Sequence, residues 1–352
     1  MMSTGSKKVL IAPLDWGLGH ATRMVPIINH YLSTGWNVFL AGDGASGEWL
    51  KKRYPNLTFL KLPGYQMQYS KKIPFVLQMI RSLPRIALSI SRERRRIKAL
   101  QRQFRFDLIL SDNRYGVRVK DVKSYIFSHQ INIRFAFARK QIFKIQKAFF
   151  RRFDGVLVPD FPTYPNLAGD LSALKKGQDV EVPLYYLGAL SRFSQVHYVH
   201  GKPRYKYAAV ISGPEPHKSL FVAQVIGAFS QIDDRTLVIV NGVVKPATLP
   251  DQIDYIISPS DDDFLKMIQS AEVLISRSGY TTLMDLLYLD LPAVLVPTPG
   301  QTEQEYLARY WSDQGWAQMI DQQDFELKKI NAPSRKLPFG HSSLAVHLER
   351  IF

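Results

Sequence analysis

Residues 276–285 read Ser-Arg-Ser-Gly-Tyr-Thr-Thr-Leu-Met-Asp and follow directly on the short apolar run Val273-Leu274-Ile275. This order predicts a strand that ends at a turn, with a helix opening at Ser278-Gly279. The next candidate strand, Ala293 to Val296, is followed by a second polar stretch, Pro297 to Tyr306. Strands that alternate with helices form a parallel sheet, so both polar stretches fall at the same edge of one sheet. The pair therefore predicts an α/β fold.

The same alternation runs along the chain and restarts once. Apolar runs of strand length recur from Val9 to Val158, and after the polar segment 188–206 the pattern starts again at Tyr207. A chain of 352 residues exceeds the length at which one hydrophobic core usually stops growing. We therefore predict two Rossmann-like domains with the active site in the cleft between them, and a tail that packs back toward the first domain. The expected bounds are residues 1–190 and 191–330 for the domains, and 331–352 for the tail.

Positive charge is concentrated in one segment. The chain has a net charge of +16, and the segment from Lys71 to Arg152 holds 22 Lys and Arg against four acids, a charge of +18 by itself. Two candidate helices in this segment, residues 76–95 and 135–149, have apolar stripes flanked by Arg and Lys. Such a region attracts an anionic membrane surface, a diphosphate-bearing acceptor or a nucleic acid. A simple solvated face, with the stripes packed on the sheet, is the alternative.

The sequence lacks three features that would indicate an oxidising, secreted or membrane-spanning protein. There are no cysteines, so neither disulfides nor thiolate metal sites hold the fold. Residues 1–8 are short and polar and show no secretory signal. No run of about 18 uncharged apolar residues, the length that a transmembrane helix needs, occurs in the sequence. We expect a cytoplasmic protein that is peripheral at the inner face of the cell membrane.

The motif at Ser278 has the chemistry of a phosphate site. Backbone N–H groups at a helix start, with hydroxyls beside them, accept phosphate oxygens. Asp285 lies seven residues after Ser278 on the same helix face, where a carboxylate can accept hydrogen bonds from ribose hydroxyls. Beyond Pro297, several polar side chains suit a hydroxyl-rich sugar; they are Gln301, Glu303, Gln304 and Glu305. A capped helix followed by a solvated helix start is the alternative.

The first strand ends at a glycine-rich turn, Gly17-Leu18-Gly19-His20. Open α/β sheets bind ligands at the carboxyl ends of their strands, so His20 is expected to face such a crevice. A histidine, whose ordinary pKa lies near neutrality, suits the role of general base toward an acceptor hydroxyl. Asp112, at the end of another strand, is the second candidate for the base. A tight turn with a helix-capping histidine is the structural alternative.

The run Asp261-Asp262-Asp263 is the one stretch that suggests a metal site. We expect it instead to cap a helix that begins at Phe264. By position, the backbone around Ser260 and Asp261 could line a pocket for the base of a nucleotide. We therefore expect no dedicated metal and no cofactor.

The carboxyl-terminal motifs resemble the donor-binding region of MurG-like glycosyltransferases, family 28 of the two-domain GT-B fold. The residues that carry this resemblance are Arg277-Ser278-Gly279, Asp285, and Pro297 with Gln304-Glu305-Tyr306. Gly17-Leu18-Gly19-His20 resembles the family's glycine-rich acceptor loop, and His129-Gln130 resembles its second acceptor-side loop. The order of elements is similar from about Val9 to Met319.

The resemblance implies a set of binding residues. In it, Ser278 and Gly279 hold the donor diphosphate, Asp285 holds the ribose, and Gln304 and Glu305 contact the transferred sugar. The full donor set is Ser212, Gly213, Ser260, Asp261, Arg277, Ser278, Gly279, Thr281, Asp285, Gln301, Gln304 and Glu305. The acceptor set is Gly17, Gly19, His129 and Gln130.

The expected function is transfer of a hexosyl or N-acetylhexosaminyl group from a nucleotide-diphosphate sugar, expected to be UDP-linked, to a hydroxyl of a lipid-linked or cell-envelope acceptor. The reaction is expected to invert the anomeric centre without a metal ion, and the nucleotide sugar is a substrate rather than a cofactor. A sugar-nucleotide 2-epimerase or hydrolase on the same fold is one alternative. A non-enzymatic protein that binds nucleic acid through the basic half is another, although the sequence has no recognition motif for nucleic acid.

Overall fold

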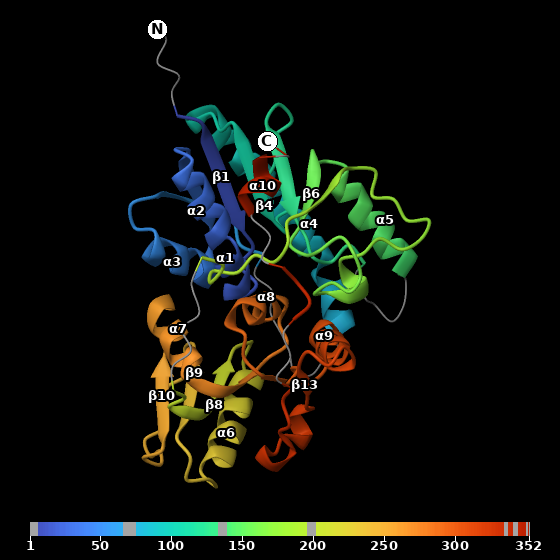
Figure 1. Ribbon diagram of the computed structural model, residues 1–352. Helices are drawn as coiled ribbons and strands as arrows, with labels where there is room; N and C mark the ends of the chain where they lie inside the picture. The colour runs from blue at the N-terminus through green and yellow to red at the C-terminus, as the bar shows by residue number, and fades with distance from the viewer. Residues whose placement is uncertain are drawn as a thin grey trace. The chain divides into compact units, whose positions relative to one another are not determined.

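The computed structural model describes residues 6–65, 75–132, 139–195, 202–333, 337–340, 344–349 and 351. Its contacts divide the chain into two compact units, Met1–Arg192 with His341–Phe352, and Phe193–Gly340 (Figure 1). The expected tail, residues 331–352, is split between the units. Ala332 packs against the core of the second unit, and the ring of Phe339 lies 5.1 Å from that of Trp316. These apolar contacts keep the first part of the tail in the second unit.

The first unit contains a seven-stranded parallel sheet in the order β3-β2-β1-β4-β5-β6-β7. Every strand from β1 to β6 except the edge strand β3 has at least four buried residues, as expected for a sheet covered on both faces. The strands are β1 Lys8–Pro13, β2 Asn37–Gly42, β3 Thr58–Lys61, β4 Leu108–Asp112, β5 Lys123–Phe127, β6 Gly155–Val158 and β7 Leu184–Tyr186.

Helices connect these strands and cover the sheet. They are α1 Leu18–Arg23, α2 Val25–Ser33, α3 Gly44–Arg53, α4 Phe75–Phe104, α5 Arg139–Phe150 and α10 Leu344–Glu349. The helical pattern after the first glycine-rich turn forms two helices, α1 and α2, because Pro26 has no N–H to continue the first one. Figure 1 shows α10 beside α2, with which it is in contact. Residues 135–138 of the second basic candidate helix lie outside the described residues, as do the side chains of residues 75–83 in the first.

The second unit contains a six-stranded parallel sheet in the order β10-β9-β8-β11-β12-β13. Its strands are β8 Tyr205–Ile211, β9 Thr236–Val240, β10 Ile253–Ile257, β11 Ala271–Ser276, β12 Ala293–Leu295 and β13 Gln318–Met319. Its α-helices are α6 His217–Phe229, α7 Asp261–Gln269, α8 Tyr280–Leu289 and α9 Thr302–Asp313. Aromatic and branched side chains of α6 pack with β8, β9 and β10 in one apolar core.

Both sheets reverse their direction of winding once. In the first unit the chain runs from β1 through β2 to β3, then crosses back to β4 on the other side of β1. In the second unit it runs from β8 through β9 to β10, then crosses back to β11 on the other side of β8. The carboxyl ends of β1 and β4, and those of β8 and β11, are therefore topological switch points, where open α/β sheets bind ligands. The prediction of two parallel α/β domains is confirmed. Among the described residues, no helix is long and apolar enough to cross a bilayer.

Candidate functional site

Hydrogen bonds from Ser46 on α3 hold the turn after β1 in place. Gly17 has a φ of 109°, a conformation that side chains other than glycine's rarely adopt. The hydroxyl of Ser46 donates to the Gly17 carbonyl at 3.0 Å, and the Ser46 amide donates to Asp15 Oδ1 at 3.0 Å. α1 then begins at Leu18, so His20 falls in its first turn, at the carboxyl edge of the first sheet.

His20 and Asp112, the two candidate bases, lie together. His20 Nδ1 is 3.0 Å from Asp112 Oδ2. The two strands before them are neighbours, and their register pairs Pro13 with Asp112. The Asp112 side chain is 0% exposed, whereas that of His20 is 15% exposed. This burial leaves the Asp112 carboxylate little access to an acceptor hydroxyl, and its role as the alternative base stays a prediction. Its geometry suits it to orient His20.

Arg23 joins this pair, and the sequence analysis gave it no role. It lies one helical turn after His20 and is 2% exposed. Its Nε donates to Asp112 Oδ2 at 2.9 Å, and its Nη2 donates to Asp112 Oδ1, a two-point contact. The spacing of three residues from His20 puts both side chains on one helix face, which is the signal that could have identified it.

Charge and burial set the protonation of the pair. Burial lowers the pKa of His20, and the positive charge of Arg23 lowers it further against the opposing effect of Asp112. Burial alone would raise the pKa of Asp112, but Arg23 and His20 outweigh it and lower that pKa to about 2. Asp112 is thus a carboxylate and His20 an uncharged imidazole at neutral pH.

The second acceptor-side loop follows β5 at the same edge. His129 is buried, and its Nδ1 lies 3.3 Å from Nη1 of Arg23. Arginine only donates hydrogen bonds, so this nitrogen of His129 accepts. Gln130 is half-buried, and its backbone carbonyl accepts from the side chain of Gln146. The structure therefore brings His129 into contact with the His20 cluster through Arg23.

In the second unit, Arg277 is a structural residue. It is 1% exposed, and its guanidinium lies 4.2 Å from the centre of the Phe221 ring. Nη1 donates to the carbonyls of Val296 and Pro297 at 3.1 Å each, and Nη2 donates to the His217 carbonyl at 3.1 Å. Arg277 belongs to the predicted donor set, and these contacts occupy its side chain. Arg277 thereby joins the segment after β12 to the first residue of α6.

The polar cluster after β12 also hydrogen-bonds to its own loop. Gln301 caps α9 by accepting from the Gln304 amide at 2.9 Å, and Gln304 Oε1 accepts from the Thr298 amide at 2.9 Å. Glu305 Oε1 accepts from the Gly300 amide at 2.8 Å. These three side chains shape the turn, which limits what their oxygens can offer to a sugar.

Ser278 follows the same pattern. Its side chain is buried, and the hydroxyl donates to the Gln304 carbonyl at 2.8 Å. This bond ties the turn after β11 to the start of α9. Gly279 is the residue before α8, and its amide and that of Ser278 lie where a helix N-terminus collects partial positive charge. Any contribution of Ser278 to phosphate binding would therefore come from its backbone rather than its hydroxyl.

Two buried hydroxyls near the carboxyl edge of the second sheet differ from that of Ser278, because they make no hydrogen bond within the described residues. Thr298 Oγ1 and Ser276 Oγ are buried and have no hydrogen-bond partner within the described part of the chain. Thr298 Oγ1 lies 4.0 Å from the point where a Cβ on Gly213 would be, and Gly213 has a φ of 113°. Ser212 and Gly213 are themselves exposed, in the turn between β8 and α6. Neither residue type is unusual after a strand, so no local signal in the sequence identifies these hydroxyls.

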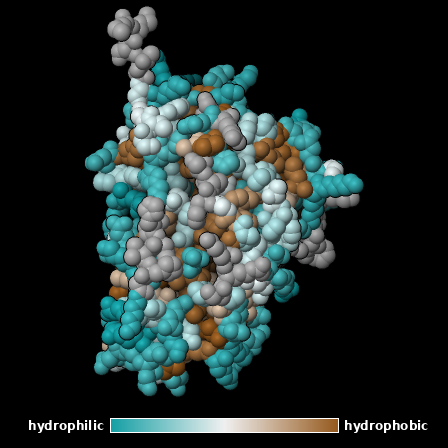
Figure 2. Space-filling view, viewed as in Figure 1, coloured by the Kyte–Doolittle hydropathy of each residue, from teal (hydrophilic) through white to brown (hydrophobic). Residues whose placement is uncertain are grey.

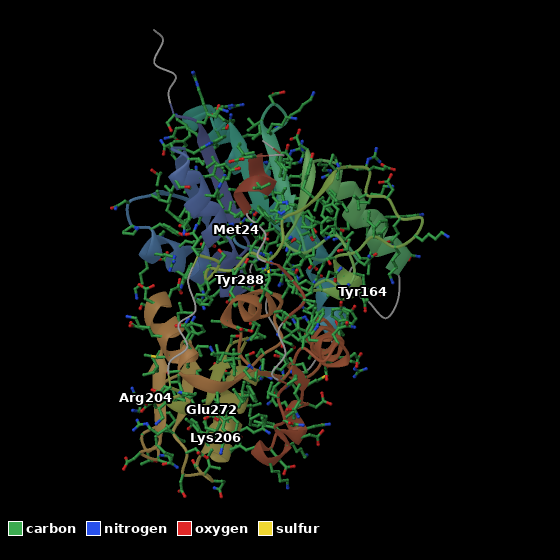
Figure 3. The ribbon with its side chains drawn as sticks, in the orientation of Figure 1. Met24, Tyr164, Arg204, Lys206, Glu272 and Tyr288 are labelled. Atoms are coloured by element: carbon green, nitrogen blue, oxygen red, sulfur yellow. The ribbon has the colours of Figure 1, made fainter. Side chains whose placement is uncertain are left out.

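The remaining donor-side residues are placed at the same carboxyl edge. Ser260 caps α7 by accepting from the Asp263 amide at 3.1 Å, so the helix begins at Asp261, one turn earlier than expected, with three acids in its first turn. Asp285 is buried on α8, and its charge contributes, after burial, to raising the pKa of Tyr288 to about 12 (Tyr288 is labelled in Figure 3). Thr281 is half-buried in the first turn of α8. The described residues contain no group of three or more His, Asp or Glu arranged to hold a metal ion.

Comparisons with known proteins agree with this architecture. Residues 216–344 match the model of the glycosyltransferase family 28 C-terminal domain. An uncharacterized glycosyltransferase of Methanosarcina acetivorans is 24% identical over 359 residues, covering 89% of this chain and 85% of the relative. A crystal structure of the glycotransferase of kitacinnamycin superposes with a TM-score of 0.64 at 15% identity, covering 91% of this chain and 87% of the other.

This protein is a glycosyltransferase with the GT-B fold. The similarity to MurG in particular covers a smaller part of the sequence. The UDP-N-acetylglucosamine–N-acetylmuramyl-(pentapeptide) pyrophosphoryl-undecaprenol N-acetylglucosamine transferase of Chlamydia trachomatis serovar L2 is 29% identical over 99 residues, 28% of the glycosyltransferase chain and 26% of the relative. A crystal structure of Acinetobacter baumannii MurG has a TM-score of 0.53 at 14% identity, with 91% of the glycosyltransferase covered and 87% of MurG.

Proposed function

We propose that this glycosyltransferase moves a hexosyl or N-acetylhexosaminyl group from a nucleotide-diphosphate sugar to a hydroxyl of a lipid-linked or cell-envelope acceptor, inverting the anomeric centre. A UDP-linked donor is the first candidate, because the Chlamydia relative is named for a UDP-N-acetylglucosamine donor. That relative's name also contains a pyrophosphoryl-undecaprenol acceptor, which supports a lipid-linked acceptor here. We propose that the enzyme works in the cytoplasm, at the inner face of the membrane.

Two buried hydroxyls without a partner among the described residues, Thr298 near Gly213 and Ser276 at the end of β11, are the observation that carries the donor site. A buried hydroxyl without a partner costs stability unless a ligand supplies one. Ser276 is the last residue of β11, which leads into α8, and Thr298 lies near Gly213 in the turn that leads into α6. The N-terminal amides of both helices favour anions. A diphosphate has the oxygens that both kinds of donor require. The donor site would then consist of backbone amides and these hydroxyls, with Asp285 directed to the ribose.

The His20 cluster would carry the acceptor chemistry. Nε2 of His20 would take the proton of the acceptor hydroxyl as its oxygen forms a bond to the anomeric carbon of the donor. The bond from that carbon to the diphosphate oxygen breaks, and the nucleoside diphosphate leaves with the electron pair. Attack from the side opposite the leaving group inverts the anomeric centre. The amides and hydroxyls of the donor site would stabilise the leaving charge, so we expect no dependence on a divalent metal.

The basic segment supports an acceptor at an anionic surface. Leu88 on α4 is 57% exposed and Ile145 on α5 is 58% exposed. Exposed arginines flank Leu88 along α4; they are Arg85, Arg92, Arg94, Arg95 and Arg96. Figure 2 shows hydrophobic residues beside hydrophilic ones on the side of the first unit where α5 lies in Figure 1. Apolar side chains rimmed by Arg and Lys suit the interface of a bilayer with acidic lipids.

Binding of nucleotide sugars tests the donor half of the proposal. The intact protein is titrated by calorimetry with UDP-N-acetylglucosamine, UDP-glucose and the matching GDP, TDP and CMP conjugates, with and without a chelator. Binding of one conjugate that survives chelation is expected. Lack of binding to every conjugate would overturn the proposal. Product analysis with a polyprenyl-diphosphate-linked sugar in vesicles then separates transfer from hydrolysis or 2-epimerisation of the donor, either of which would replace transfer as the function.

Vesicle sedimentation tests the membrane half. The protein is expected to bind vesicles that contain about 30% acidic lipid, and added salt should release it. It should not bind neutral vesicles. Leu88→Ser with Ile145→Ser should reduce the bound fraction, while the matched pair Leu220→Ser with Val244→Ser, exposed residues of the second unit, should leave it unchanged. Equal binding to acidic vesicles and to duplex DNA of the same charge would favour a non-selective basic surface instead.

A further inference from the structure

Arg23 is a buried arginine that the proposed chemistry does not use. Its side chain is among the largest fully buried ones in the protein, at 2% exposure. Arginine is almost never fully buried unless it is paired, because removing its charge from water is strongly unfavourable. A residue held at this cost beside a reactive histidine calls for a functional account.

One guanidinium contacts all three polar groups of the acceptor side. Besides the two-point contact with Asp112, Nη2 lies 2.8 Å from His20 Nδ1, and Nη1 lies 3.3 Å from His129 Nδ1. These groups come from three places: His20 from α1, Asp112 from the end of β4, and His129 from the loop after β5. Arg23 therefore fixes the relative positions of three elements that meet at one sheet edge. Met24, the next residue, is labelled in Figure 3.

Arg23 and Asp112 compete for a hydrogen bond with His20 Nδ1. That nitrogen lies 2.8 Å from a donor on Arg23 and 3.0 Å from an acceptor on Asp112. A ring nitrogen carries at most one proton, so it donates to Asp112 or accepts from Arg23, but not both. For Nε2 to accept a proton, the neutral ring must carry its own proton on Nδ1 and donate it to Asp112. A second proton would add a positive charge to a ring whose Nδ1 lies 2.8 Å from a guanidinium nitrogen. Arg23 therefore opposes the charged form of His20.

The charges that face His20 give the same result. Asp112 favours an imidazolium, as a carboxylate beside a histidine usually does, whereas Arg23 on α1 and His129 after β5 oppose it. Arg23 also neutralises the Asp112 charge through its two-point contact. Without Arg23, the buried carboxylate would act on His20 alone.

We infer that Arg23 is a positioning residue that fastens His20 and His129 to Asp112 and keeps His20 uncharged at neutral pH. The inference rests on the proposed role of His20 as the base, since a base must be uncharged to accept a proton. A histidine paired with a carboxylate alone would be protonated over more of the neutral range. Arg23 thereby extends the activity of the enzyme toward lower pH.

Titration of the His20 ring by NMR tests this inference without any substrate. The chain has eight histidines, and the His20 signal is assigned from its loss in His20→Gln. Arg23→Met should raise the midpoint of the His20 titration by about one pH unit or more, because the carboxylate is no longer offset. Arg23→Lys, which keeps the charge but not the fork, should restore most of the wild-type midpoint. Arg102→Met, an exposed arginine of the same unit, is the matched control and should change nothing.

A second comparison protects the test against misfolding. Arg23→Met leaves the buried Asp112 carboxylate without its arginine partner, so the variant could fail to fold. Asp112→Asn and the double variant Arg23→Met with Asp112→Asn avoid a lone buried carboxylate, and the double variant should titrate at higher pH than Asp112→Asn. An unchanged or lower midpoint in either comparison would overturn the inference.

Kinetics separate the inference from the proposed function. The acid limb of the pH profile of kcat for sugar transfer should move to higher pH in Arg23→Met, in step with the NMR midpoint. If the midpoint rises and the acid limb stays, Arg23 still controls the charge of His20, but His20 is not the base. A purely structural Arg23 would lower kcat at every pH and move neither quantity.

Discussion

The switch points of the two sheets use their polar residues in opposite ways. At the first, side chains from α1, β4 and the loop after β5 point at one another and form a cluster around Asp112. At the second, the side chains of Ser278, Gln304 and Glu305 bond to loop backbone. The first arrangement sets the protonation of His20 and Asp112. The second shapes a turn, and two buried hydroxyls near it have no partner among the described residues.

This difference matches the two tasks in sugar transfer. Proton removal from an acceptor needs a side chain whose pKa is controlled by its neighbours. Holding a diphosphate needs fixed hydrogen-bond donors, and a rigid turn supplies these without mobile side chains. The comparison predicts that substitutions at the first switch point change rate, whereas those at the second change stability or donor affinity.

The largest effect is expected for His20→Ala. Loss of a general base should lower kcat for sugar transfer by 10²- to 10⁴-fold, on the order of what positioned acid–base groups contribute. Donor affinity, measured by calorimetry, should remain within about threefold, because His20 lies on the first unit and the proposed donor-binding residues on the second. A large loss of donor affinity with kcat preserved would break the comparison.

Arg277→Met should come next, as a loss of stability. The methionine fills the space of the arginine stem, but three carbonyls and the side chain of Gln322 lose their donors in a buried region. We expect the free energy of unfolding to fall by about 3 kcal/mol in urea titrations. Arg309→Met on the exposed face of α9 is the matched control. If the Arg277→Met protein is stable but no longer binds the donor, Arg277 contributes to donor binding rather than to stability.

Acid should weaken the first unit through Asp112. Its pKa in the folded protein, about 2, lies below the ordinary value of 3.8, so the unfolded chain binds this proton first. The resulting stabilisation is present above about pH 4 and is lost as the pH falls toward 2, an effect of about 2 kcal/mol. Urea titrations between pH 5 and 2.5 should show a flatter decline for the double variant Arg23→Met with Asp112→Asn than for wild type. Parallel curves would contradict the ion pair.

Thr298→Val should give the smallest effect. It should lower the affinity for the ligand without lowering the stability of the free protein. The substitution removes a buried hydroxyl that has no partner among the described residues and keeps the side-chain shape. Affinity for the nucleoside diphosphate should fall about tenfold, close to the value of one hydrogen bond. The melting temperature without ligand should stay the same or rise, because an unpaired polar group is lost. Thr248→Val, an exposed control, should alter neither quantity.

Most of the fold could be predicted from the sequence, because it depends on local patterns. Apolar runs of strand length that alternate with helical spacing require parallel sheets, and the restart at Tyr207 requires a second one. The helix start at Asp261 was misplaced by one turn, since a serine and three acids in a row offer several possible caps. Pro26 divided the first helix in two for an equally local reason, its missing N–H.

The sequence alone determined that glycine-rich turns and polar residues would gather at the carboxyl edges of two parallel sheets. Only the tertiary structure decided which of those side chains face one another. Arg23 and Asp112 are 89 positions apart, and they meet because β1 and β4 pair side by side with Pro13 opposite Asp112. Arg277 turns inward because backbone carbonyls from the segment after β12 and from the start of α6 converge on it. Contacts between distant segments arise from strand order and register, which no local pattern of residues specifies.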